Sequence, residues 1–416
     1  MFLKRFRRQI YNISKKAGDR LGFDLPYFVE NGFWVVLSQV VNMAASFAMS
    51  VVFARYLPKE TFGEYQLVIS FVGIFAIISY SGLNTSIVRS VAKGFDYSYI
   101  KAVKFSFKKS LFSIPLFLSL AGWYYYQSKF QLSLAFIASG LLFSFIYAHR
   151  KWSAYWKGKE KFEKAVKQQI IQNLTLNGLL ILSAIFFSEY LLIIAGTYLL
   201  INAGFNTLWH YKTKKSITIK KIDTDCIPYG KYMTKIGLLA NLILYFDKII
   251  IGFYDIEMLA VYAIALKLFD ILKQVLKSFF SVSAPKFAKQ SVSIGKNKIF
   301  MLLFVGIVVS VFMYFISEPL IVYFFTEDYR DSAILFKKII FVLPLVFVSP
   351  LFAQKANAQK DKNKIVKIYI VAPLLAIVSS VCVLIITQNL EYLVLTKVFI
   401  MQIAYFLFLV PIFRKH

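Results

Sequence analysis

Runs of about 20 predominantly apolar residues follow one another along the whole sequence, and this feature constrains the fold more than any other. A helix needs about 20 such residues to cross the hydrocarbon core of a bilayer. Continuous apolar stretches such as 181–187 and 191–200 lack the alternation that a transmembrane β-strand requires. Only 17% of the residues are charged, against roughly a quarter in a soluble domain. The sequence therefore predicts an all-α polytopic membrane protein.

The apolar runs predict twelve transmembrane helices, and the distribution of basic residues supports this number. Of the 49 lysines and arginines, 38 fall in alternate connecting segments and the termini, whereas four fall in the opposite segments. Cytoplasmic loops of membrane proteins carry such an excess, so both termini are expected in the cytoplasm. The net charge of +28 is then an orientation signal, and nucleic acid is not an expected partner. The expected spans are 33–54, 65–83, 110–126, 131–148, 169–187, 191–209, 236–253, 258–284, 299–316, 333–353, 368–387 and 392–411.

Twelve spans divide into two halves of six, which would share their orientation in the membrane. A shift of 197 residues lays the first two spans of each half on one another, as expected for lobes related by a pseudo-two-fold axis along the membrane normal. Transporters built from two such lobes bind substrate between them and rock them in alternation. We predict a basic amphipathic segment on the cytoplasmic membrane surface at 1–32, a first lobe at 33–209, a cytosolic inter-lobe linker at 210–235 and a second lobe at 236–416.

Charged side chains inside the predicted spans are the first candidates for function, because charge in hydrocarbon is costly. Lys267, Asp270 and Lys273 lie on one face of the predicted helix 258–284. Their surplus positive charge favours an anionic ligand such as a pyrophosphate. The alternative is that Lys267 pairs with Asp270 while Lys273 extends to the membrane surface.

The preceding span carries Asn241 and Lys248 seven residues apart, with Asp247 beside them. An isolated buried carboxylate tends to be protonated. Asp247 is therefore expected to pair with Lys248 or a lysine of the next span, or to titrate. A titrating or cation-binding Asp247 or Asp270 would couple transport to a proton or sodium gradient, and a structural ion pair is the alternative.

The first half is richer in neutral polar groups than in charge. Asn42 begins a repeat of polar residues every four positions in the first span, with Gln39 beside it. Such residues either hold helices together or form a cavity wall that binds sugar hydroxyls. Gln168, Gln169, Gln172 and Asn173 open the fifth span in a similar way. Arg89 lies near the predicted cytoplasmic mouth, where it fits a phosphate as well as a plain orienting role.

Several chemistries have no support in the sequence. Two cysteines and three histidines give no disulfide framework and no metal site. No Walker motif is present, so no fused ATPase and no cofactor are expected. Glu60 and Glu64 resemble a catalytic carboxylate pair, but their turn of about ten residues is too short to hold a donor sugar. We therefore expect no enzymatic activity, with a membrane glycan polymerase or ligase as the alternative of a different class.

Two stretches resemble a known family. Residues 55–65, RYLPKETFGEY, are similar to the arginine–x–leucine–glycine–proline–x–x–phenylalanine–glycine–x–tyrosine turn of bacterial polysaccharide flippases, with Pro58 in place of the glycine. Residues 247–252, DKIIIG, followed by Tyr262 and Ala263, resemble the matching stretch of the second lobe. These flippases belong to the multidrug/oligosaccharidyl-lipid/polysaccharide (MOP) exporter superfamily, and include the O-antigen and capsule types.

The resemblance implies a function in the bacterial inner membrane. Members move an undecaprenyl-pyrophosphate-linked oligosaccharide from the cytoplasmic to the outer leaflet through a basic central cavity. It implies that Lys267 and Lys273 contact the pyrophosphate or acidic sugars and that Asp270 tunes their charge. It also implies that Asp247 and Lys248 respond to the driving ion. The polymerase and chain-length machinery of the same pathway are candidate partners, besides membrane lipids. A drug or cation antiporter of the same superfamily is the nearest alternative, although a cationic substrate would be repelled by these lysines.

Overall fold

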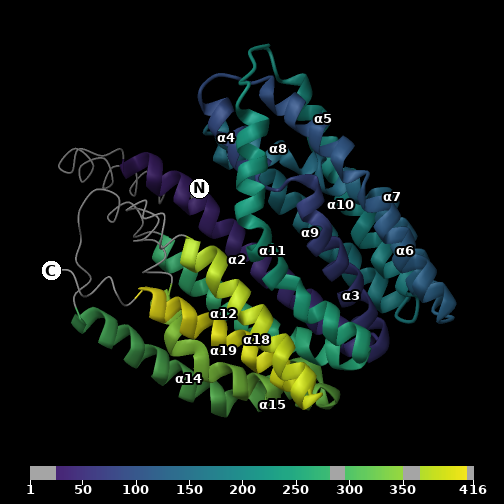
Figure 1. Ribbon diagram of the computed structural model, residues 1–416, viewed down its shortest axis with the longest axis vertical. Coiled ribbons are helices and arrows are strands. Elements are labelled where there is room, and N and C mark those ends of the chain that lie inside the picture. Colours follow the sequence, from purple (N-terminus) through teal and green to yellow (C-terminus); the bar gives the residue numbers. More distant parts are fainter. Residues whose placement is uncertain (1–24, 282–295, 350–365, 410–416) are drawn as a thin grey trace, which may run out of the picture.

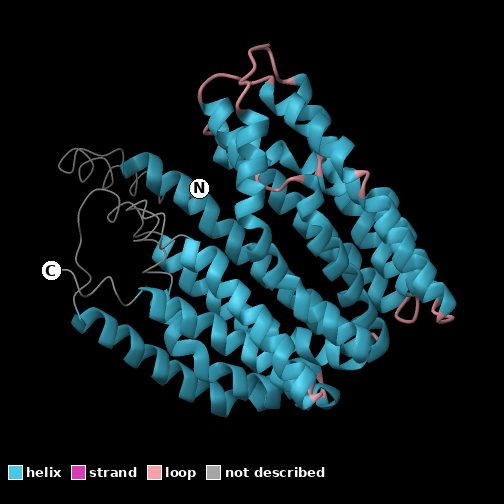
Figure 2. Ribbon diagram, in the orientation of Figure 1, coloured by secondary structure: helices cyan, strands magenta, loops and turns pink. Residues whose placement is uncertain are grey.

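The computed structural model describes residues 25–281, 296–349 and 366–409. The described residues form helices joined by short connections and contain no strand (Figure 2). Residues 1–24 of the predicted amphipathic segment (1–32) lie outside the described residues. The helices of the first half are α2 (Leu25–Tyr56), α3 (Lys59–Phe75), α4 (Leu83–Ala92), α5 (Ser98–Ser110), α6 (Ser113–Tyr126), α7 (Phe130–Tyr147), α8 (Trp152–Gly158), α9 (Phe162–Phe186) and α10 (Leu191–Lys215).

The second half begins with the long helix α11. Its helices are α11 (Cys226–Tyr254), α12 (Ile256–Ser281), α14 (Lys296–Phe325), α15 (Arg330–Ile339), α18 (Ala372–Thr387) and α19 (Leu390–Leu409). Short 3-10 turns and a π-helical turn adjoin them. They include η1 (Ala76–Ser79), η2 (His149–Lys151) and η5 (Lys367–Val371).

The predicted fold of twelve membrane helices in two lobes is confirmed. Ten helical segments of the described residues are long and apolar enough to cross a membrane. The other two are α6 and α12. The first is short because the helix breaks before Pro115, which has no N–H for the carbonyl of Leu111. The second carries Lys267, Asp270 and Lys273, which lower its hydropathy.

The two lobes meet at one end of the molecule and diverge toward the other (Figure 1). At the meeting end the α2–α3 turn packs against the α11–α12 turn, where a Cβ on Gly63 would lie 1.9 Å from the carbonyl oxygen of Ile256. Only glycine fits such a contact. The Arg55 guanidinium donates to the carbonyl oxygens of Tyr323 and Phe324 on α14, the latter at 2.9 Å. We call this the closed end.

The opposite end carries the basic connections, and we call it the basic end. The segment between α10 and α11 spans 216–225, within the predicted linker. It is fixed to the first lobe: the Asp223 N–H donates to Ser98 Oγ at 2.7 Å, and Ser90 Oγ donates to Asp223 Oδ2 at 2.7 Å. The exact boundaries of lobes and linker stay predictions.

Residues 149–158, formed by η2 and α8, make a buried elbow between α7 and α9. Two indole N–H groups fasten it to α10. Trp152 donates to Asn206 Oδ1 at 3.1 Å, and Trp156 donates to Thr213 Oγ1 at 3.0 Å. Both rings belong to an apolar cluster with residues of α4 and α5. The elbow is therefore held rigidly, and this matters for the site beside it.

Candidate functional site

A cavity of about 760 Å³ opens in the first lobe toward the basic end. Its size falls within the range of small-molecule sites. Helices α4, α9, α10 and α11 and the elbow surround it. Its lining is polar and basic, and no aspartate or glutamate is among its described lining residues. The side chains most relevant to binding are Arg89, Arg150, Lys151 and Lys157, the amides Asn84, Gln169, Gln172, Asn173, Asn202, Asn206 and Asn241, and the phenols Tyr147 and Tyr245.

Three of the four cations come from the elbow. The Lys151 side chain is almost fully buried, with 1% of its surface exposed. Its ammonium donates to the carbonyl oxygens of Ser79 at 3.0 Å and Tyr147 at 3.3 Å. Arg150 lies close enough to interact electrostatically with both Lys151 and Lys157. Within the described part of the chain, no carboxylate forms an ion pair with any of these three side chains.

Amide side chains of α9 and α10 form a continuous wall of the cavity. Gln172 Nε2 donates to Asn202 Oδ1 at 3.2 Å, and Asn206 Nδ2 donates to the carbonyl of Ile146 at 3.1 Å. We call Gln172, Asn173, Asn202 and Asn206 the amide wall. Asn206 is buried, and its oxygen and its NH2 group are both bonded within the protein. The partly exposed Asn173 and Asn202 are therefore the members that suit the hydroxyl groups of a sugar, since an amide both donates and accepts. The prediction that the fifth span opens with polar side chains anticipated half of this wall.

Three of the residues singled out from the sequence lie in or behind this cavity, namely Arg89 and Asn42 of the first lobe and Asn241 of α11. Arg89 lines it, with its guanidinium 4.8 Å from the ring centre of Tyr229. Asn241 lines it too, and donates to the carbonyls of Gly73 and Ile74 at 3.3 and 3.1 Å, across to α3. Asn42 accepts a hydrogen bond from Asn173 Nδ2 at 2.8 Å, so it joins α2 to the rear of the amide wall. Gln39 lies one turn earlier on α2.

The second-lobe lysines do not line this cavity. Lys273 pairs with Asp270 at 3.5 Å, so the alternative in which Lys267 pairs with Asp270 while Lys273 extends to the membrane surface is not what the structure shows. Lys273 can lean back onto Asp270, because helical side chains point toward the N-terminus and an acid placed before its base is favoured. Lys267 interacts electrostatically with Asp270 and Lys248. These four residues thus form a cationic cluster on α11 and α12.

Asp247 is fully buried, and its partner differs from the expected ones. Its Oδ2 lies 2.6 Å from the Lys397 ammonium of α19 and also accepts a hydrogen bond from the Tyr262 hydroxyl. The expected pairing with Lys248 or a lysine of the next span is therefore wrong, since a helix 150 residues further on packs against α11. Lys397 could have been found from the sequence, as it interrupts the apolar run 392–411.

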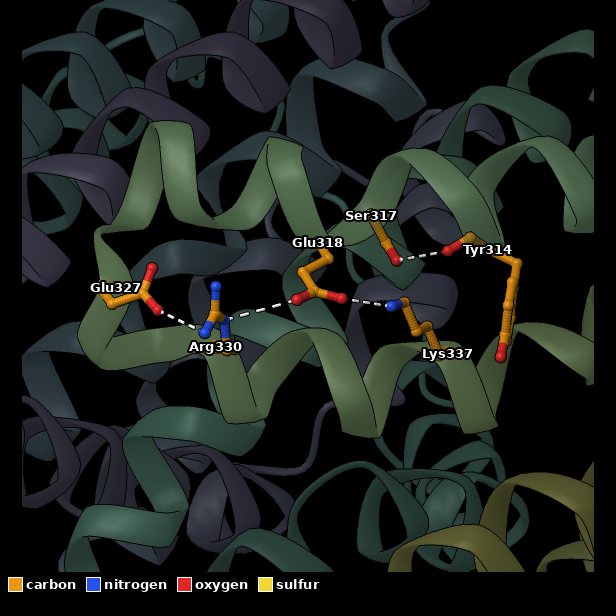
Figure 3. A network of polar contacts seen from close by, with 6 residues as sticks. All are labelled: Tyr314, Ser317, Glu318, Glu327, Arg330 and Lys337. Carbon is orange, nitrogen blue, oxygen red and sulfur yellow. Dashed lines mark hydrogen bonds and ion pairs between the residues drawn. The ribbon is translucent and has the colours of Figure 1, made fainter.

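Several carboxylates near the closed end are engaged in ion pairs. Figure 3 shows Glu318 of α14 between Arg330 and Lys337 of α15, at 3.4 and 2.5 Å, while Glu327 lies 2.8 Å from Arg330. The pair that resembles a catalytic dyad is likewise occupied. Lys129 lies 3.2 Å from Glu60 and 3.5 Å from Glu64. These acids hold helices together, which explains their presence without a reaction.

Twelve spans in two lobes, with a polar cavity in one of them, define the fold of a MOP superfamily transporter, a multi-pass membrane protein. Residues 28–291 match the family model described as polysaccharide biosynthesis protein, and the chain belongs to this family. The resemblance noted in the sequence is thereby confirmed. Comparison with curated protein sequences gives no match.

Similar solved structures share the fold at low sequence identity. An inward-facing multidrug resistance MATE family transporter has a TM-score of 0.68 at 13% identity, covering 89% of this chain and 93% of its own. The lipid II flippase MurJ, inward closed, gives 0.61 at 14%, covering 93% and 88%. A MOP superfamily transporter from Pyrococcus furiosus gives 0.54 at 12%, covering 93% and 94%. An outward-facing MATE family transporter gives a TM-score of 0.62 at 13% identity, covering 92% of this chain and 94% of its own.

Proposed function

We propose that this protein is a flippase that moves an undecaprenyl-pyrophosphate-linked oligosaccharide from the cytoplasmic to the outer leaflet of a bacterial inner membrane. The observation that carries this proposal is the first-lobe cavity, which combines cations and amides with no described carboxylate in its lining. A sugar pyrophosphate cannot cross hydrocarbon unaided, because its polar groups would lose water without replacement. Amides replace water at hydroxyl groups, and cations replace it at phosphate.

The arrangement of the lobes supports loading from the cytoplasmic leaflet. The basic end carries the positive charge that the positive-inside rule places in the cytoplasm, and the cavity opens toward it. The closed end separates the cavity from the other side. Rocking of the lobes would then expose the head group outside while the polyprenyl tail stays in lipid. In this scheme Arg89, Asn42 and Gln39 of the first lobe and Asn241 of α11 belong to the binding surface at this cavity.

The second-lobe cluster would complete the binding surface and the coupling. Lys267, Lys273 and Lys248 supply positive charge to the phosphates or acidic sugars during passage, and Asp270 tunes it. Asp247 and Asp270 are the proposed sites of coupling to a proton or sodium gradient. Surface polysaccharides such as O-antigen or capsule are the proposed products, made together with the polymerase and chain-length machinery of the pathway.

The two alternatives are less well supported. A drug or cation antiporter would need a cavity that attracts positive charge, whereas the described lining contains four cations and no acid. A glycan polymerase or ligase would need free carboxylates at the outer face. Glu60, Glu64, Glu318 and Glu327 are ion-paired there. Asp255, Glu257 and Asp331 line a separate cavity of about 390 Å³ together with Lys59, and they are the acids that the enzyme alternative would have to use.

A leaflet assay in spheroplasts of a deletion strain tests the proposal. An impermeant lectin or glycosidase reports lipid-linked oligosaccharide that has reached the outer leaflet. We expect the intermediate to accumulate out of reach and to become accessible when the gene is restored. If it reaches the outer leaflet without the gene and no polymer forms, the enzyme alternative is favoured instead.

Two variants test the second-lobe assignment in the same strain. Lys267→Ala and Lys273→Ala are each expected to abolish surface glycan at unchanged protein level, because they remove positive charge from the proposed substrate path. Lys338→Ala is the matched control, since that lysine pairs with Glu391 near the closed end. Wild-type glycan in both test variants would remove the assignment.

A further inference from the structure

The elbow gathers positive charge that the protein itself does not neutralise. Arg150, Lys151 and Lys157 all line the cavity. Lys151 and Lys157 each lie close enough to Arg150 to interact with it electrostatically. Like charges at such range repel, and burial of Lys151 makes its charge costlier still. The neighbouring Lys159 shows a different solution, because it lies 2.7 Å from the buried carboxylate of Asp96.

The Lys151 ammonium is held in place with capacity to spare. An ammonium has three donors, and two of them reach the carbonyls of Ser79 and Tyr147. No third acceptor occurs among the residues described around it. The hydrogen bonds of Trp152 and Trp156 fix the backbone that follows Lys151. A rigid cation facing a cavity, with an unused donor and no acid, is suited to an anion supplied from outside.

We infer that the elbow is a phosphate subsite, which binds the pyrophosphate of the substrate through Lys151, Arg150 and Lys157. This inference rests on the proposed function and assigns the loading step to the first lobe rather than to the α12 lysines. A pyrophosphate carries more than one negative charge, which matches a cluster of three cations better than the single carboxylate of an acidic sugar. Arg150 adds a planar fork that suits phosphate oxygens.

The amide wall then takes the sugars that extend from the phosphate. Asn202 lies 13 residues before the end of α10 at Lys215, which is about 20 Å along the helix at 1.5 Å per residue. The elbow lies nearer the basic end, at the mouth of the same cavity. The pyrophosphate would thus stay close to the membrane surface, where the lipid tail leaves it, while the oligosaccharide reaches inward along the amides.

Binding of inorganic pyrophosphate to the purified full-length protein in detergent tests this subsite without knowledge of the sugar. Calorimetry at fixed ionic strength gives the affinity, and thermal unfolding gives the stabilisation. We expect pyrophosphate to bind and to raise the melting temperature. Glycerol phosphate, as a phospholipid headgroup, and glucuronate, as an acidic sugar, should bind at least about tenfold more weakly, since each presents fewer charges to the cluster.

Two variants locate the binding. Lys151→Met and Arg150→Gln should each weaken pyrophosphate binding at least about tenfold, as expected for loss of one charge-assisted contact. Lys151→Met should do so without lowering the melting temperature of the ligand-free protein, because it removes an unneutralised buried charge. Arg150→Gln is the safer variant for folding, since that side chain is exposed. Lys338→Gln, near the closed end, should bind as the wild type does.

Several results would overturn the subsite. They are absence of pyrophosphate binding by the wild-type protein, an equal loss in Lys338→Gln, and equally tight binding of glucuronate or glycerol phosphate. The leaflet assay separates this outcome from failure of the proposed function. Wild-type protein that binds pyrophosphate but moves no oligosaccharide would keep the subsite and remove the flippase assignment. Flipping that survives Lys151→Met and Arg150→Gln unchanged would keep the flippase and remove the subsite.

Discussion

The two lobes each contain a buried lysine, and they treat its charge in opposite ways. Lys397 in the second lobe lies 2.6 Å from Asp247, whose carboxylate also accepts the Tyr262 hydroxyl. Lys151 in the first lobe has only carbonyl oxygens around it and lies beside another cation, Arg150. A charge neutralised internally can hold helices together or respond to an ion. A positive charge without a counter-ion in the protein can instead bind an anion that arrives with the substrate.

The two lysines also differ in what they do: the paired lysine holds helices together, whereas the unpaired one is available for binding. The Asp247–Lys397 pair joins α11 to α19, and Tyr262 adds α12, so three helices share one buried carboxylate. Its second oxygen, Oδ1, has no hydrogen-bond partner among the described residues. That free oxygen is where a coupling proton would be accepted under the proposed function. The elbow, by contrast, is fastened by its indoles, which leaves its cations free for a ligand.

The largest effect should come from breaking the internal pair. Lys397→Met and Asp247→Asn each remove one charge and leave the other buried, which costs about 3–5 kcal/mol of stability. The double variant should recover much of that loss, because no unpaired charge remains. Thermal unfolding of the four proteins in detergent gives the coupling energy. Strictly additive losses would show that the pair contributes nothing as a unit.

Arg55 offers an intermediate case, since its charge is satisfied by carbonyl oxygens across the lobes. Arg55→Ala should weaken the closed end by about 1.5–3 kcal/mol, the range for hydrogen bonds from a charged group. The lobes should then part more often at that end. Spin labels at Tyr126→Cys and Ile386→Cys, in a Cys382→Ser background, would report longer distances.

Arg330→Ala is the matched control for that experiment. Its guanidinium pairs with Glu318 and Glu327 inside the second lobe and does not bridge the lobes (Figure 3). The label distances should therefore stay as in the wild type. An equal lengthening in both variants would mean that Arg55 does not act as a contact between lobes.

The smallest loss of stability is expected for an exposed ion pair, whose charges are already screened by water. Lys167 lies 2.6 Å from Glu163 on the exposed face of α9, one turn apart. Lys167→Gln should lower stability by less than about 0.5 kcal/mol, because exposed ion pairs gain little. Added salt should leave even less of this difference. A loss comparable to that of Lys397→Met would contradict the distinction between buried and exposed charge.

Local sequence patterns predicted the spans well, whereas their sidedness stays a prediction. Each span is a continuous apolar run, and the hydropathy of a run depends only on the residues within it. Single residues could also be picked out from the sequence, as for the buried Asp247 and for the polar start of α9, which lines the cavity. Their roles in transport stay predictions. Prediction failed for partners, because Lys397 meets Asp247 only when helices from distant parts of the chain pack together.

The sequence by itself determined a helical membrane protein of twelve spans, and two short stretches indicated its family. The spans depend on the free energy of transferring short segments into lipid, which adds up residue by residue. Only the tertiary structure decided which charges are neutralised. The same residue type is an internal counter-ion at Lys397 and an open anion contact at Lys151. That outcome depends on whether a carboxylate from another helix lies within about 4 Å, a distance no local pattern encodes.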